Sequence, residues 1–266
     1  MSQTLTESEK KELQYAKYLL ENPGIAAKIT NILGAPIEKG LEKLPKDWSD
    51  KIGEVTQAAL LKAANSAIYT MKDIPGEEAS NKWHKLSVAI TGGIGGFFGI
   101  ASLIIELPIS TTIMLRSIAE IARANGESIT NEETKLACLE VFALGSNESS
   151  DNGSESGYYI VRTLLAKSVS EASEFILTKT IVEEGSPLLV KFIATISQRF
   201  GIQVTEKAAA QAIPAIGAAG GALINTLFID HFQDMAKGHF IVRRLERTYG
   251  EEVVKKTYME MELKQN

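Results

Sequence analysis

Apolar residues recur at three- and four-residue spacing along most of this chain, which is typical of amphipathic helices. The first stripe follows Thr6 and Glu9, whose spacing predicts a capping box at the start of a helix. That helix is predicted to stop at Asn22-Pro23. No segment shows the strict alternation of a strand, so the predicted fold class is all-α, a multi-helix bundle.

Turn and capping residues predict further helix ends. Starts are predicted at Pro36, Trp48, Pro108, the second capping box Thr130 and Glu133, and Pro187; ends are predicted at Gly34, Ile74-Pro75-Gly76, Asn125-Gly126 and Phe200-Gly201.

Two long stretches, residues 86–105 and 208–229, carry no charged side chain. Both are long enough to span a bilayer, but Gly, Ala, Ser and Thr fill much of each and supply little apolar area. We therefore interpret them as two central, glycine-rich core helices of the bundle. Reversible or re-entrant membrane contact and true membrane spans remain as alternatives.

The chain of 266 residues is interpreted as one helical domain over residues 1–266. The Gly- and Ser-rich run 145–157 predicts a loop and is a candidate subdomain boundary. A net charge of −5 argues against nucleic acid as a partner.

Cys138 is the single cysteine, which fits a reducing compartment, and its place beside an apolar stripe indicates a buried residue rather than a nucleophile. The first ten residues are polar and acidic and lack the pattern of a leader peptide. We expect a cytoplasmic protein.

Familiar catalytic motifs are missing from the sequence. The glycines of 92–99 lack the Gly-Lys-Ser/Thr ending of a phosphate-binding loop, and no Gly-x-Ser-x-Gly elbow occurs. No cofactor is predicted.

Polar residues beside the uncharged stretches are the main candidates for chemistry. Carboxylates and imidazoles are the groups used in metal binding and in acid–base catalysis. The candidate catalytic residues are Glu106, Glu140, Asp230, His231 and His239. The alternative is a structural polar network that holds helices in register, formed by Glu106, Arg116, Glu120, Glu140, Asp230 and Asp234. No Glu-x-x-His pair is present, and no metal is assigned.

Arg243, Arg244 and Arg247 form a local basic patch in this acidic chain. Guanidinium groups suit phosphate, so the patch is a candidate site for anions or lipid headgroups. Neighbouring glutamates dilute the patch, and an ordinary solvated face is the alternative.

Several segments together resemble the EcsC protein family. The resemblance is carried by 95–99, 106–119, 137–145, 155–159 and 216–246. It covers roughly residues 20–260 and implies a bacterial protein whose family is named from an operon that also encodes an ABC transporter. The family brings no assigned biochemical activity.

The leading functional hypothesis is a non-enzymatic intracellular helical protein, peripherally associated with the inner membrane or with a membrane transport or secretion system. Its expected partners are an anionic membrane surface or ABC-transporter-related membrane proteins. Two alternatives remain: a metal-dependent or hydrolytic enzyme that uses the acidic and histidine residues, and a helical bundle that binds a lipid or small molecule. The oligomeric state is left undetermined.

Overall fold

The computed structural model describes residues 4–21, 24–34, 37–67, 99–146, 156–178, 187–213 and 217–262. In these residues the chain forms helices and no strand. The α-helices are α1 (Glu7–Glu21), α2 (Ile25–Leu33), α3 (Glu38–Leu41), α4 (Trp48–Ala67), α6 (Gly99–Ala124), α7 (Glu132–Glu140), α8 (Gly157–Thr178), α9 (Pro187–Gln211), α10 (Gly217–Tyr249) and α11 (Glu251–Glu260), and a 3-10 turn, η2, spans Val141–Ala143. The all-α prediction is confirmed.

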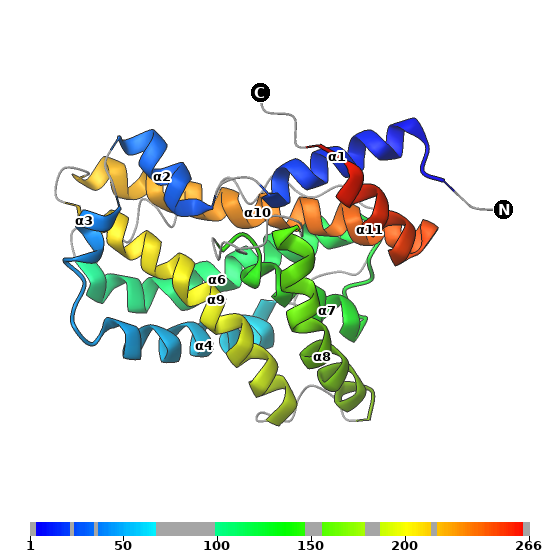
Figure 1. Cartoon of the computed structure of the whole chain (residues 1–266). Helices are drawn as coiled ribbons and strands as arrows, with labels where there is room; N and C mark the ends of the chain where they lie inside the picture. The colour runs from blue at the N-terminus through cyan, green and yellow to red at the C-terminus, as the bar shows by residue number, and fades with distance from the viewer. Residues whose placement is uncertain are drawn as a thin grey trace.

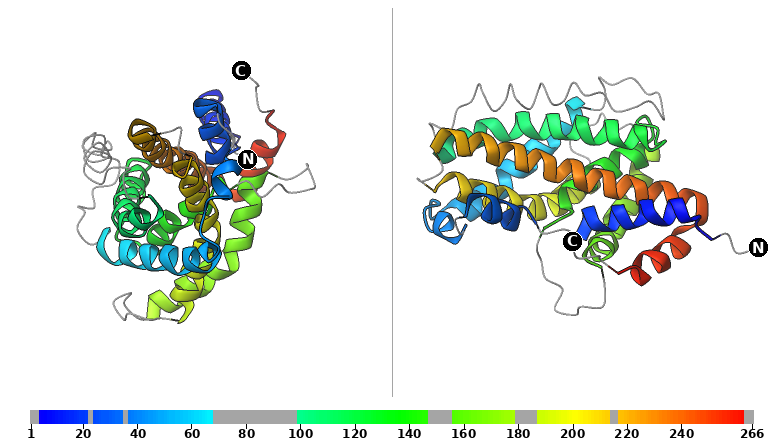
Figure 2. Two further views of the ribbon diagram at one scale, coloured as in Figure 1. Left: turned by 90° about the vertical axis from the view of Figure 1, so that its left-hand side faces the viewer. Right: turned by 90° about the horizontal axis from the view of Figure 1, so that it is seen from above.

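The long helix α10 is the central element of the described structure. It packs against α1 and α2 on one side and against α6 and α9 on another (Figures 1 and 2). Helix α4 packs on both α6 and α9, and α8 joins α7 and α9.

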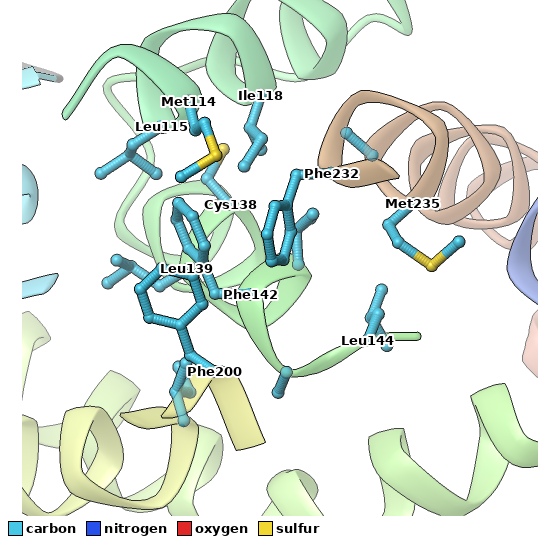
Figure 3. Close-up of a cluster of buried hydrophobic side chains, with 14 of the residues drawn as sticks. Met114, Leu115, Ile118, Cys138, Leu139, Phe142, Leu144, Phe200, Phe232 and Met235 are labelled. Atoms are coloured by element: carbon cyan, nitrogen blue, oxygen red, sulfur yellow. The ribbon is translucent and has the colours of Figure 1, made fainter. Parts of the chain in front are cut away.

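Aromatic side chains from three elements meet in the core between α6, α7, α9 and α10 (Figure 3). The Phe142 ring contacts Phe200 at a centroid distance of 5.0 Å and Phe232 at 5.2 Å, and all three rings are fully buried. Tilted and edge-to-face ring pairs are the favoured packing for aromatic groups. Cys138 is buried beside this cluster, as predicted.

Several predicted helix ends are confirmed. Thr6 and Glu9 form the capping box, with the Glu9 backbone N–H 3.3 Å from Thr6 Oγ1 and the Thr6 N–H 2.9 Å from Glu9 Oε2. Helix α6 ends before Gly126, which has a φ of +81° that favours glycine. Helices α4 and α9 begin at Trp48 and Pro187, as predicted.

Three predicted boundaries are wrong. Pro108 lies inside α6 instead of starting a helix, and α9 continues through Gly201. A proline within a helix removes one backbone hydrogen bond, but α6 is held by packing on α4 and α10. The cap of α7 is Asn131, whose side chain accepts from the Glu133 N–H at 2.9 Å, so the predicted cap at Thr130 is one residue too early.

The two uncharged stretches were each predicted to form one core helix, and the structure describes them to different extents. Residues 86–98 lie outside the described part of the chain, and 99–105 form the start of α6. The stretch 208–229 is not one helix, because 208–211 end α9 and 217–229 begin α10. Of the predicted loop 145–157, residues 147–155 lie outside the described residues.

Candidate functional site

A cavity of about 640 Å³ lies between α7, α8, α10 and α11. Its volume falls in the range of small-molecule sites. Its polar wall holds three cations, Arg162 from α8, Arg243 from α10 and Lys255 from α11, and the Tyr159 hydroxyl from α8. Four carboxylates also line it: Glu132, Glu133 and Glu140 from α7 and Glu251 from α11. We refer to this cavity as the α8 pocket.

Helix α11 is fixed beside the pocket by contacts with α1. Gly250, with a φ of +85°, allows the chain to turn from α10 into α11. The buried Lys17 ammonium then donates to the carbonyl oxygens of Tyr258 at 2.8 Å and Met261 at 2.6 Å. These bonds satisfy carbonyl groups at the C-terminal end of α11, so this wall of the pocket is anchored.

Glu140 is the last residue of α7, and its side chain is only 10% exposed. Burial raises the pKa of its carboxyl to about 7. The neighbouring Glu133 and Glu246 also raise this pKa, whereas the Arg162 and Arg243 guanidinium groups lower it. This carboxyl therefore changes its charge close to neutral pH.

His239 lies behind Glu140 and is fully buried. Its Nδ1 is 3.0 Å from the Tyr158 hydroxyl, and its Nε2 is 3.9 Å from Glu140 Oε2. No hydrogen-bond partner for Nε2 occurs in the described part of the chain. Burial, together with Arg243 and Arg162, holds the pKa of His239 well below its ordinary value, so the ring is neutral.

Both guanidinium groups of the pocket form ion pairs with carboxylates that do not line it. Arg162 Nη1 is 2.6 Å from Glu246 Oε1, and Arg243 Nε is 2.9 Å from Glu127 Oε1. Lys255 instead lies over the Tyr159 ring, 5.4 Å from its centroid. In the described residues the Lys255 ammonium has no ion pair.

The predicted arginine patch is largely engaged inside the protein. Arg243 also faces Glu133 at 3.5 Å, Arg244 pairs with Glu12, and Arg247 pairs with Glu127. The side chains of Arg244 and Arg247 are still 40% and 41% exposed. Assignment of these arginines to lipid headgroups stays a prediction.

Of the five candidate catalytic residues, Glu140 and His239 lie side by side. Glu106 is elsewhere, in a buried ion pair with Lys207 at 2.7 Å. His231 is also fully buried, and neither of its ring nitrogens has a hydrogen-bond partner in the described residues. Asp230 is exposed on α10.

Two further residues of the predicted polar network, Glu120 and Asp234, form ion pairs. Glu120 binds Arg123 at 2.5 Å, one turn along α6. Asp234 lies 3.3 Å from Lys237 and 3.7 Å from Lys28.

The described residues hold neither a cluster of metal-ligand side chains nor a helix suited to crossing a membrane. These residues contain no group of three His, Cys, Asp or Glu side chains able to hold a metal ion. Within the same ranges, none of the helices combines the length and apolar character needed to cross a membrane.

Sequence reasoning missed Tyr158, Arg162, Lys255 and Lys207. Arg162 and its partner Glu246 are 84 positions apart, so no local spacing joins them. Tyr158 lies within segment 155–159, which carried the family resemblance, and that was the only signal available for it.

The fold and site define an all-helical protein with a polar pocket at one end of its long helix. Comparison with protein families identifies it further: the EcsC protein family matches residues 7–245, so the chain belongs to this family. The predicted resemblance is confirmed. No curated protein and no solved structure matches the chain.

Proposed function

We propose that this protein is a helical binding protein whose α8 pocket takes a small polar molecule. The observation that carries the proposal is the Glu140 carboxyl, which is 10% exposed and lines a cavity of about 640 Å³ without a hydrogen-bond partner in the described residues. The carboxyl is reached from the cavity, so a ligand that enters the pocket can form a hydrogen bond with it.

The composition of the wall supports a specific ligand rather than bulk lipid. Charged groups surround Glu140, while Ala166 and Val169, three residues apart on α8, provide a small apolar surface. Ligand sites typically combine an apolar wall with a few convergent polar groups.

Ligand-observed NMR with a panel of small carboxylates, amines, amides and sugars tests this proposal. Ala166 is an exposed residue of the pocket wall, and Ala166→Trp should fill part of the cavity and abolish binding. Leu164→Trp is the matched control, because Leu164 is on the same helix, 60% exposed and not part of the wall. Absence of binding by every probe, or equal binding by both variants, would contradict the proposal.

Peripheral membrane association, the leading hypothesis from the sequence, stays a prediction. The alternative of a metal-dependent or hydrolytic enzyme also stays a prediction. Such an enzyme would need several of the five candidate catalytic residues at one site. In the described structure Glu140 and His239 meet, whereas Glu106 is paired elsewhere with Lys207.

A further inference from the structure

Carboxylates outnumber cations on the wall of the α8 pocket, and most of the charged groups balance one another. Glu132 pairs at 2.7 Å with Lys135, which does not line the cavity. On α11, Glu251 and Lys255 are four positions apart, so they lie on one face of the helix and offset each other.

The two arginines of the wall are also balanced by carboxylates. Arg162 lies 2.6 Å from its carboxylate partner on α10, and these two charges cancel. Arg243 lies 2.9 Å from Glu127 and 3.5 Å from Glu133, and Arg247 is the second partner of Glu127. This second group contains two arginines and two glutamates, so it has no net charge.

Glu140 is the carboxyl group left over from these pairs. Its side chain is 10% exposed and lines the cavity, and in the described part of the chain no hydrogen bond reaches it. The closest ring nitrogen, His239 Nε2, is 3.9 Å away and belongs to a neutral imidazole. Because a nearly buried carboxylate is stabilised by a counter-ion, ionised Glu140 suits a ligand that brings one positive charge.

The same wall offers a hydrogen-bond acceptor and an apolar surface. The Thr163 hydroxyl donates to the Tyr159 carbonyl oxygen at 2.8 Å, so its oxygen lone pairs remain to accept from a ligand. Ala166 and Val169 follow at three-residue spacing on the same face of α8. A primary ammonium group has three N–H donors, and an alkyl chain attached to it would match the apolar positions.

We propose that the ligand of the α8 pocket is a small primary alkylammonium ion, which donates its N–H groups to ionised Glu140 and packs its alkyl chain against Ala166 and Val169. This inference rests on the proposed binding function and specifies its ligand class.

Binding of such a cation depends on pH, because Glu140 has to lose its proton. The charged and titratable groups around Glu140 are Arg162 and Tyr158 from α8, Arg243, Glu246 and His239 from α10, Glu133 from α7, and Glu251 and Lys255 from α11. Without ligand the pKa of the Glu140 carboxyl is about 7. Below this value the cation must displace a proton, so its affinity falls as the pH drops.

Isothermal titration calorimetry with butylamine, butyramide and butyrate at pH 6 and pH 8, in sodium phosphate, tests the ligand class. Butylamine is an ammonium ion at both pH values, because alkyl amines have pKa values of about 10. At pH 8 it should bind the wild type about tenfold or more tightly than either analogue. Its affinity should rise about tenfold from pH 6 to pH 8.

Glu140→Gln keeps the shape of the side chain but cannot ionise. This variant should bind butylamine about tenfold more weakly than the wild type at pH 8, and equally at both pH values. Glu252→Gln is the matched control, because it removes the same charge at an exposed position of α11 that does not line the pocket. The control should bind butylamine as the wild type does.

Three results would overturn the inference: butyramide or butyrate binding as tightly as butylamine, an affinity for butylamine that does not change with pH, or an unchanged affinity in Glu140→Gln. If those analogues bind and Ala166→Trp abolishes their binding, the pocket function stands and only the ligand class is wrong. If no probe binds, both proposals fail.

Discussion

Lys207 Nζ lies 2.7 Å from Glu106 Oε1, and the two side chains are 1% and 5% exposed. The Phe228 ring also lies beneath the ammonium group, 4.9 Å from it to the centroid. Burial lowers the pKa of Lys207, and Glu106 opposes this effect. This ion pair joins α6 to α9 in the interior.

Removing one member of that pair should be far more harmful than removing both. Lys207→Met leaves a buried carboxylate without its counter-ion and should lower the free energy of unfolding by about 3–5 kcal/mol. The double variant Glu106→Leu with Lys207→Met should recover most of this loss. Urea unfolding of the three proteins measures the coupling; additive losses would show that the pair is energetically unimportant.

Glu140→Gln should stabilise the protein at pH 8. The folded-state pKa of about 7 exceeds the ordinary value of 4.5, so between these values the folded state binds more protons than the unfolded state. Stability from this group is therefore greatest at low pH and falls as pH rises toward 7. The gain of the variant over wild type should grow between pH 4.5 and pH 7 by on the order of 3 kcal/mol. Urea unfolding across that range checks it, and a constant difference would contradict it.

His231→Leu should protect the protein against acid. Burial lowers the pKa of His231 to about 3, with a further contribution from Lys28. Below pH 6.5 the unfolded state binds a proton that the folded state rejects, so wild-type stability falls as pH drops from 6.5 toward 3.

The His231→Leu variant lacks that loss, and it also removes two buried ring nitrogens without partners in the described residues. Its advantage should therefore increase by about 1.4 kcal/mol for each pH unit below 6.5. Thermal unfolding at pH 7 and pH 5 measures this trend. An advantage that is the same at both values would show that His231 does not contribute to acid sensitivity.

Gly238→Ala should be strongly destabilising, whereas Gly53→Ala should not. A Cβ atom at Gly238 would lie 2.6 Å from Leu20 Cγ and 3.0 Å from the Ala16 carbonyl oxygen, so α1 and α10 would have to separate. At Gly53, apart from the neighbouring backbone of α4 itself, no atom of the described residues lies within 4 Å of an added Cβ. Because alanine is the better helix former, Gly53→Ala should gain up to about 1 kcal/mol. Melting temperatures of both variants test this, and equal shifts would contradict it.

Vesicle co-sedimentation tests the predicted membrane association. Arg244 and Arg247 are the exposed members of the patch, so Arg244→Ala with Arg247→Ala should lower the fraction bound to anionic vesicles several-fold at low salt. Lys256→Ala is the control, as an exposed cation outside the patch. No binding by the wild type at low salt would contradict the prediction.

The sequence by itself determined the fold class, the family and several helix ends. Helical spacing depends on residues three or four apart, and the Thr6–Glu9 capping box and Gly126 act within one turn of the chain. Such local rules failed where packing prevailed, as at Pro108 and Gly201, which both lie inside long helices held by their neighbours.

Only the tertiary structure decided which polar residues meet. Glu140, Tyr158 and His239 were visible as residue types, but their contacts join α7, α8 and α10 across long stretches of chain. Burial in turn decided that Glu140 titrates near pH 7 while His239 stays neutral, because removal from water disfavours the charged form of each group. The arginine patch was clear in the sequence, but its ion pairs were not. Glu12, Glu127 and Glu133 pair with these arginines because helix packing brings them close.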